Sequence, residues 1–137
     1  MDPAFQAFLT GLPIFLLHGS LALLIWGAGI GLYMAITPHD EIKLVRDGNA
    51  AAGLSLGAAA IGIAIPIAAT LASSHSLIDL AVWGFTALML QLASYRGVDL
   101  LVKDLSRRIA KGEIAAASVL IGVKLSSSLI TAAGLVG

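Results

Sequence analysis

Residues 50–72 read AAAGLSLGAAAIGIAIPIAATLA, an apolar run without a single Lys, Arg, Asp or Glu. A helix that crosses a membrane needs about 20 mostly apolar residues, at roughly 1.5 Å of rise per residue. Three further stretches meet this requirement: Leu12–Ile36, Leu77 to about Leu101, and Ile114–Val136. The sequence therefore predicts an all-α membrane protein with four transmembrane helices.

The composition of the whole chain supports this class and excludes others. Of its 137 residues, 58% are hydrophobic and 12% are charged, which is about half the charge of a typical soluble domain. Eight Lys and Arg balance eight Asp and Glu, so the chain lacks the basic excess of a nucleic-acid binder. The sequence has no Cys, no Gly-rich phosphate loop and no His-Glu-x-x-His motif. We expect no enzymatic activity, no cofactor, no metal and no nucleic-acid partner.

The positions of Lys and Arg in the loops predict the orientation, because cytoplasmic loops retain positive charge. The N-terminal tail, the turn at residues 73–76 and the C-terminus contain neither residue. All seven loop cations lie in or beside the other two connecting segments: Lys43, Arg46, Arg96, Lys103, Arg107, Arg108 and Lys111. We expect both termini on the outer side and both charged segments in the cytoplasm.

The two charged segments are similar to each other, which predicts an internal repeat. A shift of 64 residues, without a gap, pairs Asp40 with Asp104, Lys43 with Arg107, Val45 with Ile109, and Gly48 with Gly112. We expect a single transmembrane domain over residues 1–137, with repeat 1 at about 12–73 and repeat 2 at about 76–137. Because both halves start and end on the same side, the two-helix repeats would be parallel.

Each charged segment predicts a short amphipathic helix at the cytoplasmic headgroups or an extension of the preceding span. In the first segment, Thr37 is expected to cap a helix that starts at Pro38, with Asp40 at the third helical position. Gly48 and Gly112 are expected to end the two short helices in the left-handed conformation.

Several motifs together resemble a known family. Thr37-Pro38-His39-Asp40-Glu41, Leu44–Asn49 before an alanine run, Ser76–Asp79 before Trp83-Gly84 and Gln91-Leu92, and Leu105–Ala116 resemble the YjfL-like family of small bacterial inner-membrane proteins. That family is a domain of unknown function, so the resemblance implies a four-helix inner-membrane protein without an established activity. Its loop motif corresponds here to Thr37, Pro38, Asp40, Glu41, Arg46, Gly48, Asn49 and Glu113. The chain departs from the family pattern at Lys124, where a small residue is expected, and at Thr131, where Asn is expected.

Lys124 is the most informative side chain, because it lies near the middle of its span. A cation at that depth costs about 2.5–3.5 kcal/mol on insertion scales. Ser127, Ser128 and Thr131 share its helix face, and Gln91 lies at a similar depth in the third span. One hypothesis is a polar, hydrated path through these five residues. The alternative is a lysine that is buried at a helix contact and solvated by hydroxyls, or one that extends to the headgroups.

His18, His75 and Asp79 lie near the outer surface, where a shared depth permits a His–carboxylate cluster that titrates near neutral pH. The alternative is that each side chain simply reaches water.

Two functions remain open at this point. The first is a non-enzymatic module of the inner membrane that binds itself or envelope proteins. The second is a small ion or solute channel or transporter centred on Lys124. The pairs Gly27-x-x-x-Gly31 and Gly53-x-x-x-Gly57 would permit close helix contacts. We therefore expect a homo-oligomer in the lipid bilayer.

Overall fold

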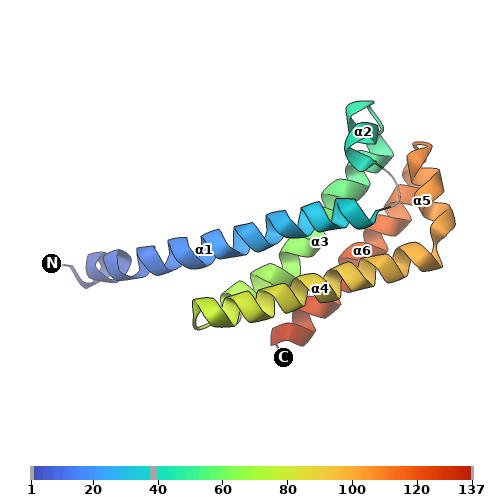
Figure 1. Cartoon of the computed structure of the whole chain (residues 1–137). Coiled ribbons are helices and arrows are strands. Elements are labelled where there is room, and N and C mark those ends of the chain that lie inside the picture. Colours follow the sequence, from blue (N-terminus) through green and yellow to red (C-terminus); the bar gives the residue numbers. More distant parts are fainter. Residues whose placement is uncertain (1, 38–39, 137) are drawn as a thin grey trace.

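The computed structural model of the chain describes residues 2–37 and 40–136 (Figure 1). Within these residues, the long helices are α1 (Pro3–Ile36), α3 (Ala50–Ser73), α4 (Leu77–Leu101) and α6 (Ile114–Val136). The short helices are α2 (Glu41–Arg46) and α5 (Lys103–Ala110). Each long helix has the length and hydropathy of a membrane span, so the predicted all-α class with four spans is confirmed.

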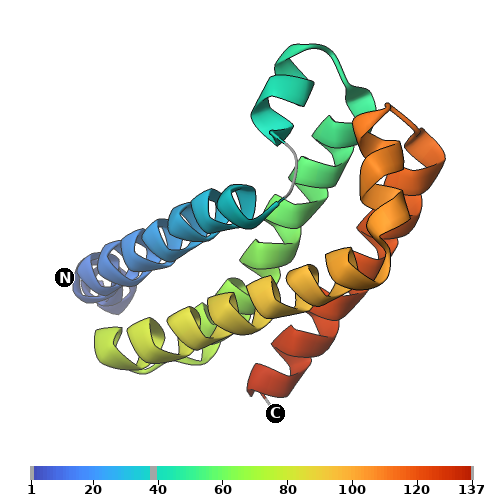
Figure 2. The ribbon, with the colours of Figure 1, turned by 45° about the vertical axis from the view of Figure 1, so that its right-hand side comes forward.

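The long helices run between two distinct ends of the molecule. The short helices α2 and α5 lie together at one end, and the chain termini and the turn at residues 74–76 lie at the other (Figures 1 and 2). We call these the α2–α5 end and the terminal end. All of the connecting segments with Lys or Arg therefore lie at a single end of the bundle.

Helix α1 begins well before the predicted start at Leu12. The Asp2 carboxylate accepts the N–H of Ala4 at 3.0 Å, and Pro3 occupies the first helical position, where its missing N–H costs nothing. These two residues start the helix at Pro3. At about 1.5 Å per residue, α1 is about 50 Å long, longer than the roughly 30 Å hydrocarbon core of a bilayer.

Helix α2 begins at Glu41, so the predicted start at Pro38 is wrong. Asp40 is the residue that caps it, since its carboxylate accepts a backbone N–H from the first turn at 3.2 Å. The Thr37 hydroxyl instead donates to the Tyr33 carbonyl at 2.7 Å and lies at the end of α1. Thr37 is therefore not the cap of α2, and Pro38 lies outside the described residues.

Gly48 and Gly112 follow α2 and α5 with φ of 86° and 89°, so their prediction as left-handed terminators is confirmed. Asn49 comes next and begins α3, because its side-chain oxygen accepts a backbone N–H of that helix at 3.0 Å. Its amide also donates to the carbonyls of Ile109 and Ala110, at 3.2 and 3.1 Å. One side chain thus joins the start of α3 to the end of α5.

Helix α3 lies at the centre of the packing and contacts the other three long helices. Its most extensive contact is with α6, where Ala51 and Ala52 of α3 and Ala116 and Ala117 of α6 are buried in one cluster. Small side chains permit such close contact of two backbones. The close seam between α3 and α6 directs Lys124, on α6, into the protein interior.

Candidate functional site

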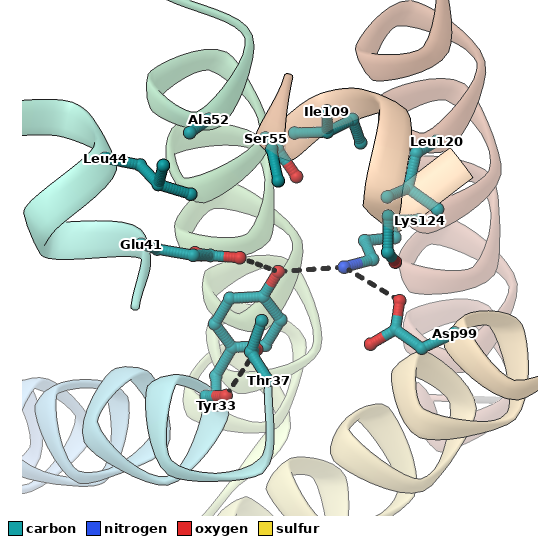
Figure 3. Close-up of a pocket in the computed structure, with 12 residues that line it drawn as sticks. Tyr33, Thr37, Glu41, Leu44, Ala52, Ser55, Asp99, Ile109, Leu120 and Lys124 are labelled. Atoms are coloured by element: carbon teal, nitrogen blue, oxygen red, sulfur yellow. Dashed lines mark hydrogen bonds and ion pairs between the residues drawn. The ribbon is translucent and has the colours of Figure 1, made fainter. Parts of the chain in front are cut away.

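Three charged side chains are buried near the α2–α5 end: Glu41 of α2, Asp99 of α4 and Lys124 of α6. The Lys124 ammonium donates to the Tyr33 hydroxyl at 2.8 Å, and its Nζ lies 3.6 Å from Oδ1 of Asp99. The Tyr33 hydroxyl in turn donates to Oε1 of Glu41 at 3.2 Å (Figure 3). We refer to these four residues as the Lys124 cluster.

The local structure explains why four elements supply this cluster. Side chains on a helix tilt toward its N-terminus, so the Lys124 stem extends from mid-span toward the α2–α5 end. Tyr33 lies in the last turn of α1, Asp99 lies in the last turn of α4, and Glu41 is the first residue of α2. The three residues therefore reach the level of the ammonium group.

Two tyrosine rings surround the Lys124 ammonium. Its Nζ lies 4.7 Å from the centroid of the Tyr33 ring and 5.1 Å from that of Tyr95, distances at which a ring face attracts a cation. The Tyr95 hydroxyl is 3.2 Å from Oγ of Ser128. Tyr95 fits here because Gly62 has no side chain, since a Cβ at Gly62 would collide with the Tyr95 hydroxyl oxygen.

A small cavity borders the cluster, lined by Tyr33, Glu41, Asp99, Lys124 and Ser55 among others (Figure 3). It offers about 20 Å³ to the centres of water molecules, and a single water needs roughly 10–15 Å³. Oε2 of Glu41 is buried without a hydrogen-bond partner among the described residues. Burial raises the pKa of the Glu41 carboxyl, and the Lys124 ammonium offsets part of that effect. The arrangement therefore suits the exchange of a proton.

Ser127, Ser128 and Thr131 of the predicted polar path share a face of α6, but neither they nor Gln91 of α4 are partners of the ammonium group. Within the described chain, Lys124 Nζ makes no hydrogen bond to Gln91, Ser127, Ser128 or Thr131. The Ser128 hydroxyl donates to the Lys124 carbonyl at 2.9 Å, and Thr131 donates to the Ser127 carbonyl at 2.9 Å. The Gln91 amide donates to the Ser127 hydroxyl at 3.1 Å. The ammonium points away from Ser127, Ser128 and Thr131, because these residues follow Lys124 in α6 while its side chain tilts toward the N-terminus of the helix.

The predicted outer residues lie at the terminal end without forming one cluster. His18 and His75 line a cavity of about 440 Å³, and Asp79 borders a separate cavity of about 320 Å³. Nδ1 of His18 is 2.9 Å from the Ile14 carbonyl oxygen, and the Asp79 carboxylate accepts the backbone N–H of His75 at 3.3 Å. Across residues 2–37 and 40–136, neither imidazole ring pairs with Asp79.

The remaining residues of the loop motif lie at the α2–α5 end. Arg46 is the exposed last residue of α2. Glu113 directly precedes α6 and forms an ion pair with Arg108. Glu41 is the motif residue that enters the Lys124 cluster.

The sequence predictions did not include Tyr33, Tyr95 or Asp99 in the site. For Asp99 a signal existed, since an acidic residue within an apolar span usually has a partner in the protein interior. For the tyrosines no comparable signal existed, because aromatic residues are common in membrane helices.

Comparison with known proteins agrees with a membrane protein. Residues 7–135 match the family model described as Domain of Unknown Function (DUF350). The chain belongs to this family. The UPF0719 inner membrane protein YjfL of Escherichia coli strain K12 is 32% identical over 102 residues, which cover 74% of this chain and 77% of that protein. The protein of the same name from Escherichia coli O157:H7 gives the same values.

The DUF350 assignment confirms the resemblance that the sequence motifs predicted. The chain is an inner-membrane protein of a family without an established function, and neither description indicates a catalytic activity. No solved structure gives a significant match to the chain.

Proposed function

We propose that the protein is a non-enzymatic module of the inner membrane that works as a homo-oligomer. One observation carries this proposal, namely the open side of α1. This helix packs on α3 and α4, while Gly27, Ala28, Gly31 and Ala35 remain exposed. A side chain at Gly27 or Gly31 would meet nothing within 4 Å. Such a face favours close contact with another helix, because small residues permit van der Waals packing that lipid does not replace.

Crosslinking in native membranes tests this proposal. We expect at least a dimer for the wild type and a clear loss of it after replacement of Gly27 and Gly31 by Ile. Gly122 of α6 is a matched control, since it is also exposed with nothing within 4 Å of an added side chain. Gly122→Ile should leave the dimer intact. A strictly monomeric wild type in membranes and in several mild detergents would overturn the proposal. If crosslinking captures envelope proteins and no second copy of this chain, the module is hetero-oligomeric.

We also propose that the α2–α5 end faces the cytoplasm, with α2 and α5 at the headgroups and both termini outside. The seven loop cations at that end support this orientation. Reporter fusions at the C-terminus and near Ser74 should read outside, and insertions near Asp47 or Lys111 should read inside. A cytoplasmic C-terminus would overturn the orientation.

Equivalent backbone hydrogen bonds support the proposed parallel repeats at about 12–73 and 76–137. In both halves a glycine and the residue after it bond back to the preceding short helix, and the two sets are related by the shift of 64 residues. The bonds are Gly48 to Val45 (3.0 Å), Asn49 to Leu44 (2.9 Å), Gly112 to Ile109 (2.9 Å) and Glu113 to Arg108 (3.1 Å).

One observation favours a second function, a small ion or solute conduit. Polar groups continue from Lys124 toward the terminal end, and the fully buried Gln91 keeps an Oε1 without a partner among the described residues. A hydrated path would explain that free acceptor, because water satisfies buried polar groups.

The variant Lys124→Met separates the two functions when flux and melting temperature are measured together in proteoliposomes. A conduit predicts altered flux in the variant while the fold survives. The module predicts a changed melting temperature with background flux in both proteins, and background flux under several ion gradients would remove the conduit from consideration.

A further inference from the structure

We propose that the cavity beside Glu41 is a proton-binding site, in which the Glu41 carboxylate takes up a single proton from the α2–α5 end. This inference goes beyond the membrane module proposed above, since it concerns one subunit and holds for a monomer as well as for an oligomer.

The first argument is a count of buried charge. When fully ionised, the Lys124 cluster has two carboxylates, Glu41 and Asp99, and a single ammonium group. The surplus negative charge lies away from water, where an unpaired ion is strongly disfavoured. A proton on one of the two carboxylates makes the cluster neutral. One carboxylate therefore has a physical reason to bind a proton.

The contacts assign that proton to Glu41. Asp99 is the carboxylate that pairs with Lys124, at 3.6 Å. Glu41 reaches the ammonium only through the Tyr33 hydroxyl, which donates to its Oε1. Its other oxygen, Oε2, has no partner among the described residues, and the residue is 8% exposed, so bulk water does not solvate this atom. Oε2 is therefore the atom at which an O–H bond can form.

Asp99 is the other carboxyl that lines the cavity, and it is already paired with Lys124. Burial raises the pKa of the Glu41 carboxyl, against the opposing effect of the Lys124 ammonium, which agrees with the geometry. Each element packed around the cavity contributes at most one titratable group. These groups are Tyr33 from α1, Asp99 from α4 and Lys124 from α6, while the polar lining from α3 and α5 is the neutral hydroxyls of Ser55 and Ser106.

The cavity also provides a route for the proton. Its lining includes Thr37, Ser106 and Ala110, which are half-buried at the α2–α5 end. A water molecule in the cavity can give a proton to Oε2, which forms the O–H bond of a neutral carboxylic acid, and take up another from bulk water. Release reverses this transfer, so no other reactant is needed.

The experiment uses the fact that the chain contains two glutamates, Glu41 and Glu113. The full-length protein is labelled with ¹³C at the glutamate side-chain carboxyl, reconstituted in lipid, and followed by solid-state NMR over a pH series. We expect the Glu41 signal to keep the chemical shift of a neutral carboxylic acid at a pH at which the other signal is that of a carboxylate. Glu113 gives the second signal, because it is exposed and paired with Arg108.

Two variants assign the signals. Glu41→Gln, which imitates the neutral acid in shape, should remove the late-titrating signal. Glu113→Gln should leave that signal alone in the spectrum, and this second variant provides the assignment if the first does not fold.

Two results would overturn the proposal. The first is a pair of glutamate signals that change together with pH. The second is a Glu41 midpoint that differs between sodium chloride and N-methylglucamine chloride, since that dependence would show a bound metal cation in place of a proton. Neither result depends on the oligomeric state, so the proton site and the homo-oligomeric module can fail separately.

Discussion

The Lys124 cluster and the residues His18, His75 and Asp79 are two sets of ionisable side chains at opposite ends of the bundle, and they are organised differently. In the Lys124 cluster, side chains from four elements contact one another, and its three charged members are buried. At the terminal end, the His18 ring and the Asp79 carboxylate contact backbone groups of nearby residues. Depth accounts for the difference, because a buried charge needs a partner while a side chain near the boundary reaches water.

The largest expected effect comes from removing one partner of the buried pair. Asp99→Leu removes the carboxylate that pairs directly with the Lys124 ammonium, and breaking a buried pair in this way costs about 3–5 kcal/mol. Asp79→Leu is the matched change at the terminal end, where loss of an exposed first-turn contact costs about 1 kcal/mol. Both values are measured as free energies of unfolding in mixed micelles.

A double variant shows whether the stability lost in Asp99→Leu comes from the unpaired charge or from the shape of the new leucine side chain. Asp99→Leu combined with Lys124→Met removes both charges, and a buried pair replaced by apolar residues is often tolerated. We expect the double variant to recover most of the lost stability. Equal losses for Asp99→Leu and Asp79→Leu would contradict the view that depth separates the two ends.

A smaller effect is expected from Tyr33→Phe, which removes the hydroxyl between Lys124 and Glu41 but keeps the ring. Hydrogen bonds to charged groups contribute about 1.5–3 kcal/mol, and the bond from the Lys124 ammonium to this hydroxyl is of that kind. His18→Phe at the terminal end should change the unfolding free energy by about 0.5 kcal/mol or less. A cost for Tyr33→Phe as small as that for His18→Phe would show that the hydroxyl does not link the cluster.

The features that the sequence predicted are those encoded by neighbouring residues. The three later spans follow from apolar runs, and the left-handed ends of α2 and α5 follow from Gly48 and Gly112. The start of α1 was misjudged because the Asp2 cap and Pro3 extend the helix beyond the apolar run. The start of α2 was misjudged because Thr37, Pro38 and Asp40 offer competing helix starts. In the structure Asp40 caps α2, while the Thr37 hydroxyl bonds to the end of α1.

The candidate site was predicted in part for the same reason. The burial of Lys124 could be inferred from its depth in one span, but its partners Tyr33, Glu41 and Asp99 come from three other elements. A single sequence does not show which helices are neighbours, so the predicted partners were residues on the same face, such as Ser128, and Gln91 at a similar depth. The Cβ tilt of the helix directs the long Lys124 side chain away from them.

The smallest expected effect compares the two residues that cap helices at opposite ends. Ser76 caps α4 with one hydrogen bond, to the N–H of Asp79 at 3.1 Å, and Ser76→Ala should cost about 1 kcal/mol. Asn49 caps α3 in the same way, but its amide also donates to two carbonyls at the end of α5. Asn49→Ala should therefore cost about 1 kcal/mol more, since a typical hydrogen bond contributes about 0.5–1.5 kcal/mol.

Asn49→Asp isolates that additional contribution, because aspartate keeps the cap of α3 while it removes both amide donors. We expect Asn49→Asp to weaken the contact between Asn49 and α5. Amide hydrogen exchange should then become faster in the last turn of α5, while the first turn of α3 stays protected. Exchange that stays unchanged in both α3 and α5 would show that Asn49 acts as a cap alone, since aspartate keeps that cap. In that case the two ends of the bundle would be held by equivalent local contacts, and the difference between them would rest on the Lys124 cluster.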